Sequence, residues 1–301
     1  KNMTRNGWGL AREMADEEEE ETAQALTEEL ISDSLSGIES TIDGRSVAFT
    51  TLNLEGKKIE DISPVSLLEH IRYAYLSRNL IKDLSPLSNL HHLLSLKLDN
   101  NKFEAVDLGS LSFLQFADLS NNKLGSWTGV DAPLLRYLDL SFNRIQTVSG
   151  LEKNPQLQNL FLHGNELETC EGTGHPSIKE ITLHKNKISD LQGLSALVNV
   201  KKLNLSENNI ASLNGLPLGE LVSLDLRQNQ LSDVACLTAV QATGLRELNL
   251  EENPVAENLD RINVLRTLSS LTSLNGVAVT PQEQALASEP LVEEGEQPAS
   301  E

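Results

Sequence analysis

Two histidines are the first candidates for chemistry, because imidazoles at a repeated spacing can hold a metal ion. His163 and His184 stand at equivalent places in the phrases LFLHGN and ITLHKN, so their side chains are expected on neighbouring strands. The same place in the flanking phrases holds Ser141, Ser206 and Arg227, which supply no strong third ligand. Two imidazoles alone are a poor zinc site. The sequence therefore predicts no metal site, and we expect both histidines to face solvent or a protein partner.

The sequence contains no constellation typical of catalysis or nucleotide binding. The Gly-x-Gly at Gly172 to Gly174 is not followed by the further glycines, or by the Gly-Lys-Ser/Thr, of a phosphate-binding loop. An active site also needs a nucleophile, a base and oxyanion donors in fixed geometry. We therefore predict no enzymatic activity, no cofactor and no small-molecule substrate.

The two cysteines, Cys170 and Cys236, are not expected to form a disulfide. They lie three phrases apart, which on stacked strands corresponds to roughly 14 Å at ~4.8 Å per strand, beyond disulfide reach. Reduced cysteines are typical of the cytosol. Since no apolar run reaches membrane-spanning length either, we expect a cytoplasmic protein.

Aromatic side chains are the third candidate, for protein docking rather than for catalysis. Six of the nine phenylalanines and tyrosines fall at positions that alternate outward from the expected strands. Exposed aromatic clusters are typical of interfaces. The alternative is that surface rings simply stack on each other across strands. The predicted protein-binding residues are Tyr73, Tyr75, Phe116, Tyr137, Phe142 and Phe161.

These residues belong to a phrase that recurs along the chain. Residues 135–145 read LRYLDLSFNRI, and close copies of this apolar pattern follow at spacings of 21 to 24 residues. One copy cannot bury its own apolar face, so neighbouring copies must stack around a continuous core. Ten copies begin at Phe49, Ile71, Leu93, Leu114, Leu135, Leu157, Ile178, Val200, Leu221 and Leu245.

The phrase is that of leucine-rich repeats, which predicts an α/β solenoid with a parallel β-sheet on its concave side. Between phrases, apolar residues recur at every third position, as in Ile188, Leu191 and Leu194, which favours 3₁₀ or short helical turns on the convex side. Nine of the ten phrases have an asparagine at the place that Asn143 occupies, and its carboxamide can bond backbone groups of adjacent turns. We interpret the asparagines as a structural ladder, not as a binding site. Helical caps are expected at both ends, the first as an amphipathic helix over 26–38.

The distribution of charge along the sequence distinguishes the two ends of the chain from its body. The net charge of −20 is concentrated towards the two ends, and the body has no long basic stripe. Binding to nucleic acid or to a membrane surface is therefore not expected. The predicted domains are an acidic arm, disordered or ordered by a partner, over 1–24; an N-terminal helical cap over 25–45; ten repeats over 46–256; a C-terminal cap over 257–287; and an acidic disordered tail over 288–301.

The repeats resemble the short intracellular class found in a phosphatase-1 regulatory protein and in an axonemal dynein light chain. A narrower resemblance rests on the acidic lead-in, the segment LTEELISDSLSGI and the stretch IRYAYLSRNLIKDLSPLSNLHHLLSLKLDNNKF. Together these look like the leucine-rich repeat-containing protein 23 family, a ciliary radial-spoke component. The likeness covers roughly residues 26–280.

This resemblance implies a non-catalytic scaffold in the radial spokes of the axoneme of motile cilia and flagella. Such a protein would lie in the cytoplasm with the cytoskeleton, and its partners would be other spoke proteins. Two alternatives stay open: a protein phosphatase regulatory subunit, and another axonemal adaptor associated with dynein. The resemblance identifies no contact residues.

Overall fold

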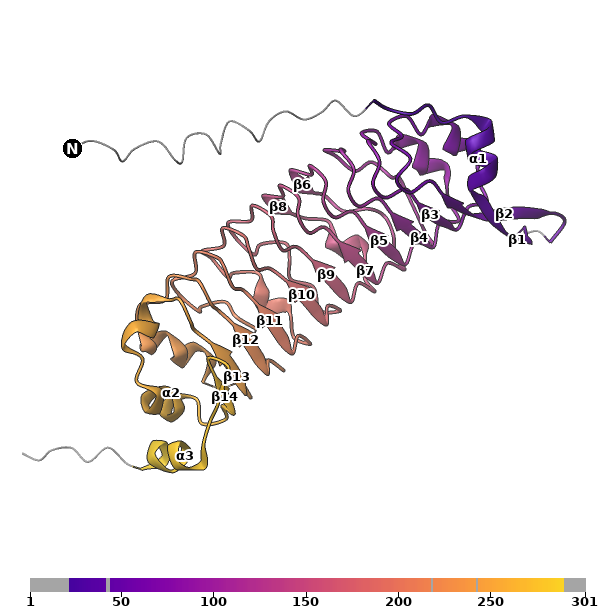
Figure 1. Ribbon diagram of the computed structural model, residues 1–301. Coiled ribbons are helices and arrows are strands. Elements are labelled where there is room, and N and C mark those ends of the chain that lie inside the picture. Colours follow the sequence, from indigo (N-terminus) through magenta and orange to yellow (C-terminus); the bar gives the residue numbers. More distant parts are fainter. Residues whose placement is uncertain (1–21, 42–43, 218, 242, 290–301) are drawn as a thin grey trace, which may run out of the picture.

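The protein is a long stack of repeats that share one sheet (Figure 1). The computed structural model describes residues 22–41, 44–217, 219–241 and 243–289. The main sheet has 13 strands in the order β1-β2-β3-β4-β5-β7-β9-β10-β11-β12-β13-β14-β15. The predicted leucine-rich-repeat solenoid is confirmed. Most of the predicted acidic arm and tail lies outside the described residues.

Ten strands of this sheet coincide with the ten predicted phrases. They are β2 (Val47–Asn53), β3 (Tyr73–Tyr75), β4 (Ser95–Lys97), β5 (Phe116–Asp118), β7 (Tyr137–Asp139), β9 (Asn159–Phe161), β10 (Glu180–Thr182), β11 (Lys202–Asn204), β12 (Ser223–Asp225) and β13 (Glu247–Asn249). Neighbours among them pair in parallel. Leu138, at the centre of β7, is fully buried between Ala117 of β5 and Leu160 of β9. Its two neighbours in the strand face outward, as the two-residue period of a strand requires.

Among the described residues, short 3₁₀ turns lie in five of the nine connections between these ten strands, and a sixth follows β13, as the three-residue apolar period predicted. They are η1 (Ser63–Leu67), η2 (Ser85–Asn89), η3 (Leu151–Lys153), η4 (Leu194–Ala196), η5 (Val234–Val240) and η6 (Pro254–Asn258). Two adjacent repeats also pair away from the main sheet, through β6 (Ser126–Trp127) and β8 (Thr147–Val148) (Figure 1). This pairing accompanies the burial of Trp127, which is 2% exposed.

The asparagine column forms a hydrogen-bond ladder between successive turns. In Asn143, Nδ2 donates to the carbonyls of Leu119, Leu140 and Ser141 at 3.1, 3.0 and 3.2 Å, and Oδ1 accepts from the amide of Leu124 at 3.1 Å. Each buried backbone group left unpaired would cost about 1–3 kcal/mol. The predicted structural role is confirmed. The column consists of Asn79, Asn101, Asn122, Asn143, Asn165, Asn186, Asn208, Asn229 and Asn253.

The N-terminal cap is a short helix followed by a strand, which corrects the predicted helix over 26–38. Helix α1 (Glu28–Ser34) begins after Thr27, whose hydroxyl accepts from the amide of Leu30 at 3.2 Å. The chain then extends as β1 (Leu35–Ser40), which pairs antiparallel with β2 and projects from the first repeat (Figure 1). The edge of β2 offers backbone hydrogen bonds that a longer helix would leave unmade.

The C-terminal cap closes the last repeat with two helices and two short strands. They are α2 (Arg261–Thr267), β14 (Ser273–Leu274), β15 (Val277–Ala278) and α3 (Pro281–Ser288). The Arg261 guanidinium connects them, because it donates to Glu283 in α3 at 2.6 Å and to the carbonyls of Leu274, Val277 and Ala278. No helix in the described part of the chain is long and apolar enough to cross a membrane.

Glycines mark places where the backbones of successive repeats approach closely. Gly150 precedes η3 with a φ of +77°, and a Cβ there would lie 2.2 Å from the carbonyl oxygen of Thr128. A Cβ at Gly172 would lie 1.9 Å from the Val148 oxygen, and one at Gly174 would be equally obstructed. The Gly-x-Gly pair therefore serves backbone packing.

Candidate functional site

Four of the six predicted docking residues lie in one band on the outer face of the main sheet. Tyr75 ends β3, Phe116 begins β5, Tyr137 begins β7 and Phe161 ends β9, and each is partly buried. They face outward because they flank the inward-pointing central residue of a three-residue strand. Together with Lys97, at the end of β4, they form what we call the aromatic belt.

Contacts along the belt are continuous. The Lys97 ammonium lies 5.6 Å from the ring centroid of Tyr75 and 5.8 Å from that of Phe116. Phe116 stacks on Tyr137, with centroids 4.4 Å and planes 12° apart, because the two residues are register partners in adjacent strands. Tyr137 then meets Phe161 diagonally at 5.1 Å. Four rings, with the Lys97 ammonium between Tyr75 and Phe116, thus form one surface across the neighbouring strands β3, β4, β5, β7 and β9.

The other two predicted residues are not part of the belt. Tyr73 is in register with Ser95, which separates it from Phe116 in the following strand. Phe142 lies in the turn after β7, is 48% exposed and has a left-handed φ of +53°. Its ring packs over Gly164, where a Cβ would come within 2.6 Å of Phe142 Cδ1. The predicted stripe therefore divides into the belt and a second cluster that contains Phe142, while Tyr73 belongs to neither.

This second cluster, which we call the rim cluster, consists of Phe142, His163 and His184. Phe142 meets His163 edge to face at 4.9 Å, and His163 stacks on His184 at 4.5 Å with planes 8° apart. His163 Nδ1 lies 2.9 Å from the Thr182 hydroxyl. No set of three or more His, Cys, Asp or Glu side chains within the described ranges is placed to hold a metal ion. The stacked imidazoles extend the aromatic surface past the ends of the strands.

The rim cluster should make stability depend on pH. Burial lowers the pKa of His163 below its ordinary value. Burial and the adjacent His163 lower the pKa of His184 as well, and the nearby Lys185 acts in the same direction, while Glu207 and Asp225 oppose it. The unfolded imidazoles keep a pKa of about 6.5, so the unfolded chain binds protons first. Stability should therefore fall as pH drops from about 7 through the folded pKa values.

We expect acidification from about pH 7.5 to about pH 5.5 to lower the melting temperature of the wild type more than that of the His163→Gln, His184→Gln double variant. Glutamine keeps a polar side chain but does not titrate. His91→Gln, at an exposed position, is the matched control and should behave as the wild type does. Equal losses for the wild type and the double variant would contradict the prediction.

Sequence reasoning missed two carboxylates beside the belt. Asp118 and Asp139 are register partners in β5 and β7, in the same row as Lys97 and Phe161. Burial, with the charges of Asp139 and Asp118, raises the pKa of Tyr137 to about 12, which keeps its phenol protonated. The repeated Asp-Leu-Ser at 118–120 and 139–141 signals a local turn, but it does not reveal that these carboxylates adjoin a ring stack.

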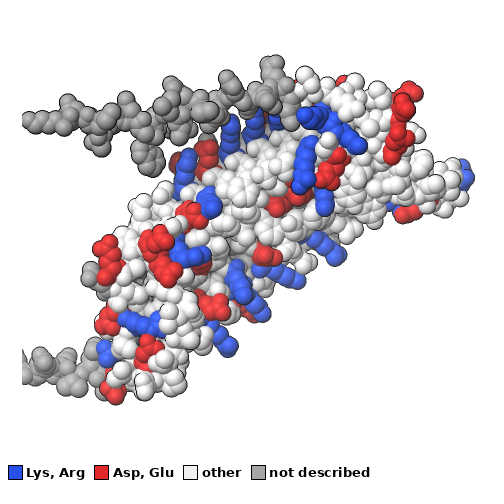
Figure 2. All heavy atoms as spheres, in the orientation of Figure 1, with Lys and Arg blue, Asp and Glu red and all other residues white. Residues whose placement is uncertain are grey.

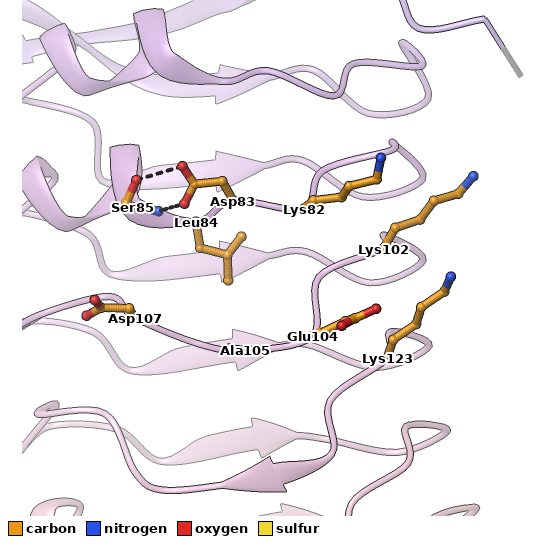
Figure 3. Close-up of a pocket in the computed structure, with 9 residues that line it drawn as sticks. All are labelled: Lys82, Asp83, Leu84, Ser85, Lys102, Glu104, Ala105, Asp107 and Lys123. Carbon is orange, nitrogen blue, oxygen red and sulfur yellow. Dashed lines mark hydrogen bonds between the residues drawn. The ribbon is translucent and has the colours of Figure 1, made fainter.

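A hollow of ≈ 450 Å³ lies beside η2, and its lining is mainly charged, whereas the belt is mainly aromatic (Figure 3). Lys82, Lys102 and Lys123 line the hollow and point in one direction, and Glu104 is among the acids between them. Lys82 is paired with Glu60 at 2.6 Å. The lining holds one hydroxyl and carboxylate together, since Ser85 donates its hydroxyl to Asp83 at 2.8 Å and its amide to the same carboxylate at 2.9 Å (Figure 3). These bonds belong to the local turn that begins η2, so the belt remains the candidate site.

Charges of both signs are interspersed on the face of the stack seen in Figure 2. Ion pairs link neighbouring repeats, as between Lys187 and Glu166 at 2.9 Å and between Lys201 and Glu220 at 3.4 Å. That face shows no continuous basic stripe of the kind that neutralises a phosphate backbone.

Comparison with known proteins agrees with this architecture. A family model described as leucine rich repeats (2 copies) matches residues 133–172, which include β7 and β9. Among solved structures, an internalin from Listeria monocytogenes superposes with a TM-score of 0.52 at 22% sequence identity, covering 78% of this chain and 77% of the internalin. At that identity the likeness shows the fold alone.

Two curated relatives confirm the narrower resemblance drawn from the sequence. Leucine-rich repeat-containing protein 23 from Bos taurus is 33% identical over 141 residues, and that from Homo sapiens is 32% identical over 141 residues. Each match covers 46% of this chain but only 41% of the relative. The chain thus has the fold of a leucine-rich repeat solenoid and is similar, over less than half of its length, to leucine-rich repeat-containing protein 23.

Proposed function

We propose that the protein is a non-catalytic scaffold that holds a protein partner against its sheet, with the aromatic belt as the anchor. The observation that carries this proposal is the continuous contact of Phe116, Tyr137 and Phe161 on a surface that solvent still reaches. Rigid aromatic side chains grouped in this way are typical of interface cores. Ten strands at ~4.8 Å each extend about 45 Å, which is enough for an extended segment or a helix.

The setting that we propose is the axoneme of motile cilia and flagella, where the protein would be a radial-spoke subunit in contact with other spoke proteins. The support for this setting is the similarity to leucine-rich repeat-containing protein 23. A scaffold of this kind needs a large, rigid surface and no cofactor. The solenoid supplies such a surface, because every repeat is fixed to the next by strand pairing and by the asparagine ladder.

Removal of two belt rings should weaken docking without unfolding the protein. In the Phe116→Ser, Tyr137→Ser double variant, partner affinity should fall at least about tenfold, because central aromatic residues carry much of the energy of an interface. The circular dichroism spectrum should be unchanged, since both side chains lie outside the core. The measurement is retention of the protein on salt-washed axonemes, together with the spoke proteins that co-purify with it.

Phe113→Ser is the matched control. Phe113 is 45% exposed, and its ring meets His92 at 6.2 Å rather than the belt, so its loss should leave retention unchanged. If the belt variant is retained as the wild type is, the partner uses another surface and the docking proposal fails. If a phosphatase catalytic subunit is recovered in stoichiometric amounts and spoke proteins are not, the axonemal proposal fails and the protein is a phosphatase regulatory subunit instead.

A further inference from the structure

Two aspartates beside the aromatic belt each keep one carboxylate oxygen available. Asp118 Oδ1 accepts from the amide and hydroxyl of Ser120 at 3.1 and 2.7 Å. Asp139 Oδ1 accepts from the amide and hydroxyl of Ser141 at 2.9 and 2.6 Å. The serines thus fix both carboxylates in orientation, and no hydrogen bond from a described residue reaches either Oδ2.

No described residue forms an ion pair with either carboxylate. Lys97 is the register partner of Asp118, but its ammonium lies over the rings of Tyr75 and Phe116. Asp99, two residues after the end of β4, adds a further negative charge, and its carboxylate accepts from the Ser77 hydroxyl. This part of the sheet therefore carries three carboxylates against one ammonium.

The negative charge is costly to the isolated chain. Burial raises the pKa of Asp118, and the charges of Asp139 and Asp99 raise it further, although the hydrogen bonds from Ser120 oppose them. A carboxylate that is partly removed from water and repelled by its neighbours gains when an external cation approaches it. The charge pattern therefore favours a basic ligand and disfavours an acidic one.

The belt itself shows that its rings accept a cation. At one end, Lys97 lies over the faces of Tyr75 and Phe116. At the other end, Tyr137 and Phe161 meet at 5.1 Å, and Phe161 is the register partner of Asp139. Rings and carboxylate there adjoin each other, an arrangement that combines cation–π attraction with a charge-assisted hydrogen bond.

We propose that the belt binds a partner segment in which a basic side chain, preferably arginine, is flanked by apolar residues. The apolar residues cover Phe116, Tyr137 and Phe161, and the basic group reaches the free oxygens of Asp118 and Asp139. This inference rests on the proposed docking function and adds the chemistry of the partner. Arginine fits better than lysine because its planar guanidinium stacks on rings, donates to two acceptors at once and is weakly hydrated.

The test uses the full chain and short acetylated peptides in which leucine alternates with arginine, glutamine or glutamate. Binding is measured by fluorescence anisotropy. The arginine peptide should bind at least about tenfold more tightly than the glutamine peptide, and the glutamate peptide should bind least. In the Asp118→Asn, Asp139→Asn double variant the preference for arginine should fall to near parity, and the salt dependence of binding should weaken with it.

Glu104→Gln with Asp107→Asn is the matched control, because it removes the same charge from the hollow beside η2 rather than from the belt. It should leave the arginine preference intact. An unchanged preference in the Asp118→Asn, Asp139→Asn variant would overturn the inference. The Phe116→Ser, Tyr137→Ser variant separates the two proposals. If this variant binds none of the peptides while the Asp118→Asn, Asp139→Asn variant binds all of them as the wild type does, the docking surface is correct and only the basic partner is wrong. If the Phe116→Ser, Tyr137→Ser variant binds every peptide normally, the docking surface itself is wrong.

Discussion

Replacement of Gly150 by alanine should lower the free energy of unfolding by about 2–5 kcal/mol. The backbone there has a φ of +77°, and the new Cβ would lie 2.2 Å from the Thr128 carbonyl oxygen. The obstructing atoms are backbone, held in the previous repeat by strand pairing and by the buried core. They cannot rotate away as a flexible side chain would, so the repeats must separate locally or the residue must change its conformation.

Gly56→Ala provides the control for this experiment. Gly56 has a similar φ of +68°, but a Cβ there would meet nothing within 4 Å. Its replacement should therefore cost only the left-handed conformation, about 1–2 kcal/mol. Denaturant unfolding followed by circular dichroism measures both variants. Equal losses would show that backbone conformation, and not contact between repeats, sets the effect at Gly150.

The architecture could be predicted from the sequence because every repeat must bury the same kind of apolar face against its neighbours. A residue such as Leu138 or Asn143 recurs at one place in nearly all copies, so its inward or ladder role is inferred many times over. An irregular copy changes little, since its neighbours still fix the strand. Even the Ala117 repeat keeps its strand and register, although alanine there gives a weaker apolar signal.

The candidate site was only partly predictable, because it depends on residues that do not repeat. Alternation along a strand shows that Tyr137 faces outward, but not that it meets Phe161 diagonally. Phe142 lies three residues past the end of β7, where the chain becomes left-handed and carries the ring to His163. Asp118 resembles an ordinary polar residue in a repeat until the register places it beside the ring stack.

The N-terminal cap shows a different limit. Leu26, Leu30, Ile31, Leu35 and Ile38 have the spacing of one helical face, and this pattern predicted a longer helix. The structure keeps the helix only to Ser34, and Ile38 is 66% exposed in β1. The helix ends there because the following residues pair as β1 with the edge strand β2, which lies farther along the chain. Local periodicity contains no information about such a partner.

Leu138→Ala should destabilise the protein by about 2–5 kcal/mol, because it removes a fully buried side chain and leaves a cavity in the shared core. The neighbour on one side is already Ala117, which cannot fill the space. Leu67→Ala is the control, since Leu67 in η1 is 81% exposed and its truncation should have little effect. Comparable losses of unfolding free energy in the two variants would mean that the core collapses around the smaller residue.

Leu138 and Tyr137 are adjacent in the chain but face opposite sides of the sheet, so together they separate folding from docking. Leu138→Ala should lower the melting temperature while partner affinity stays near the wild-type value at temperatures where the protein is folded. Tyr137→Ser should do the reverse. This contrast is expected because Leu138 fills the core between its neighbours in β5 and β9. The Tyr137 ring contacts Phe116 and Phe161 outside the core, and such cross-strand pairs contribute only about 0.2–1 kcal/mol.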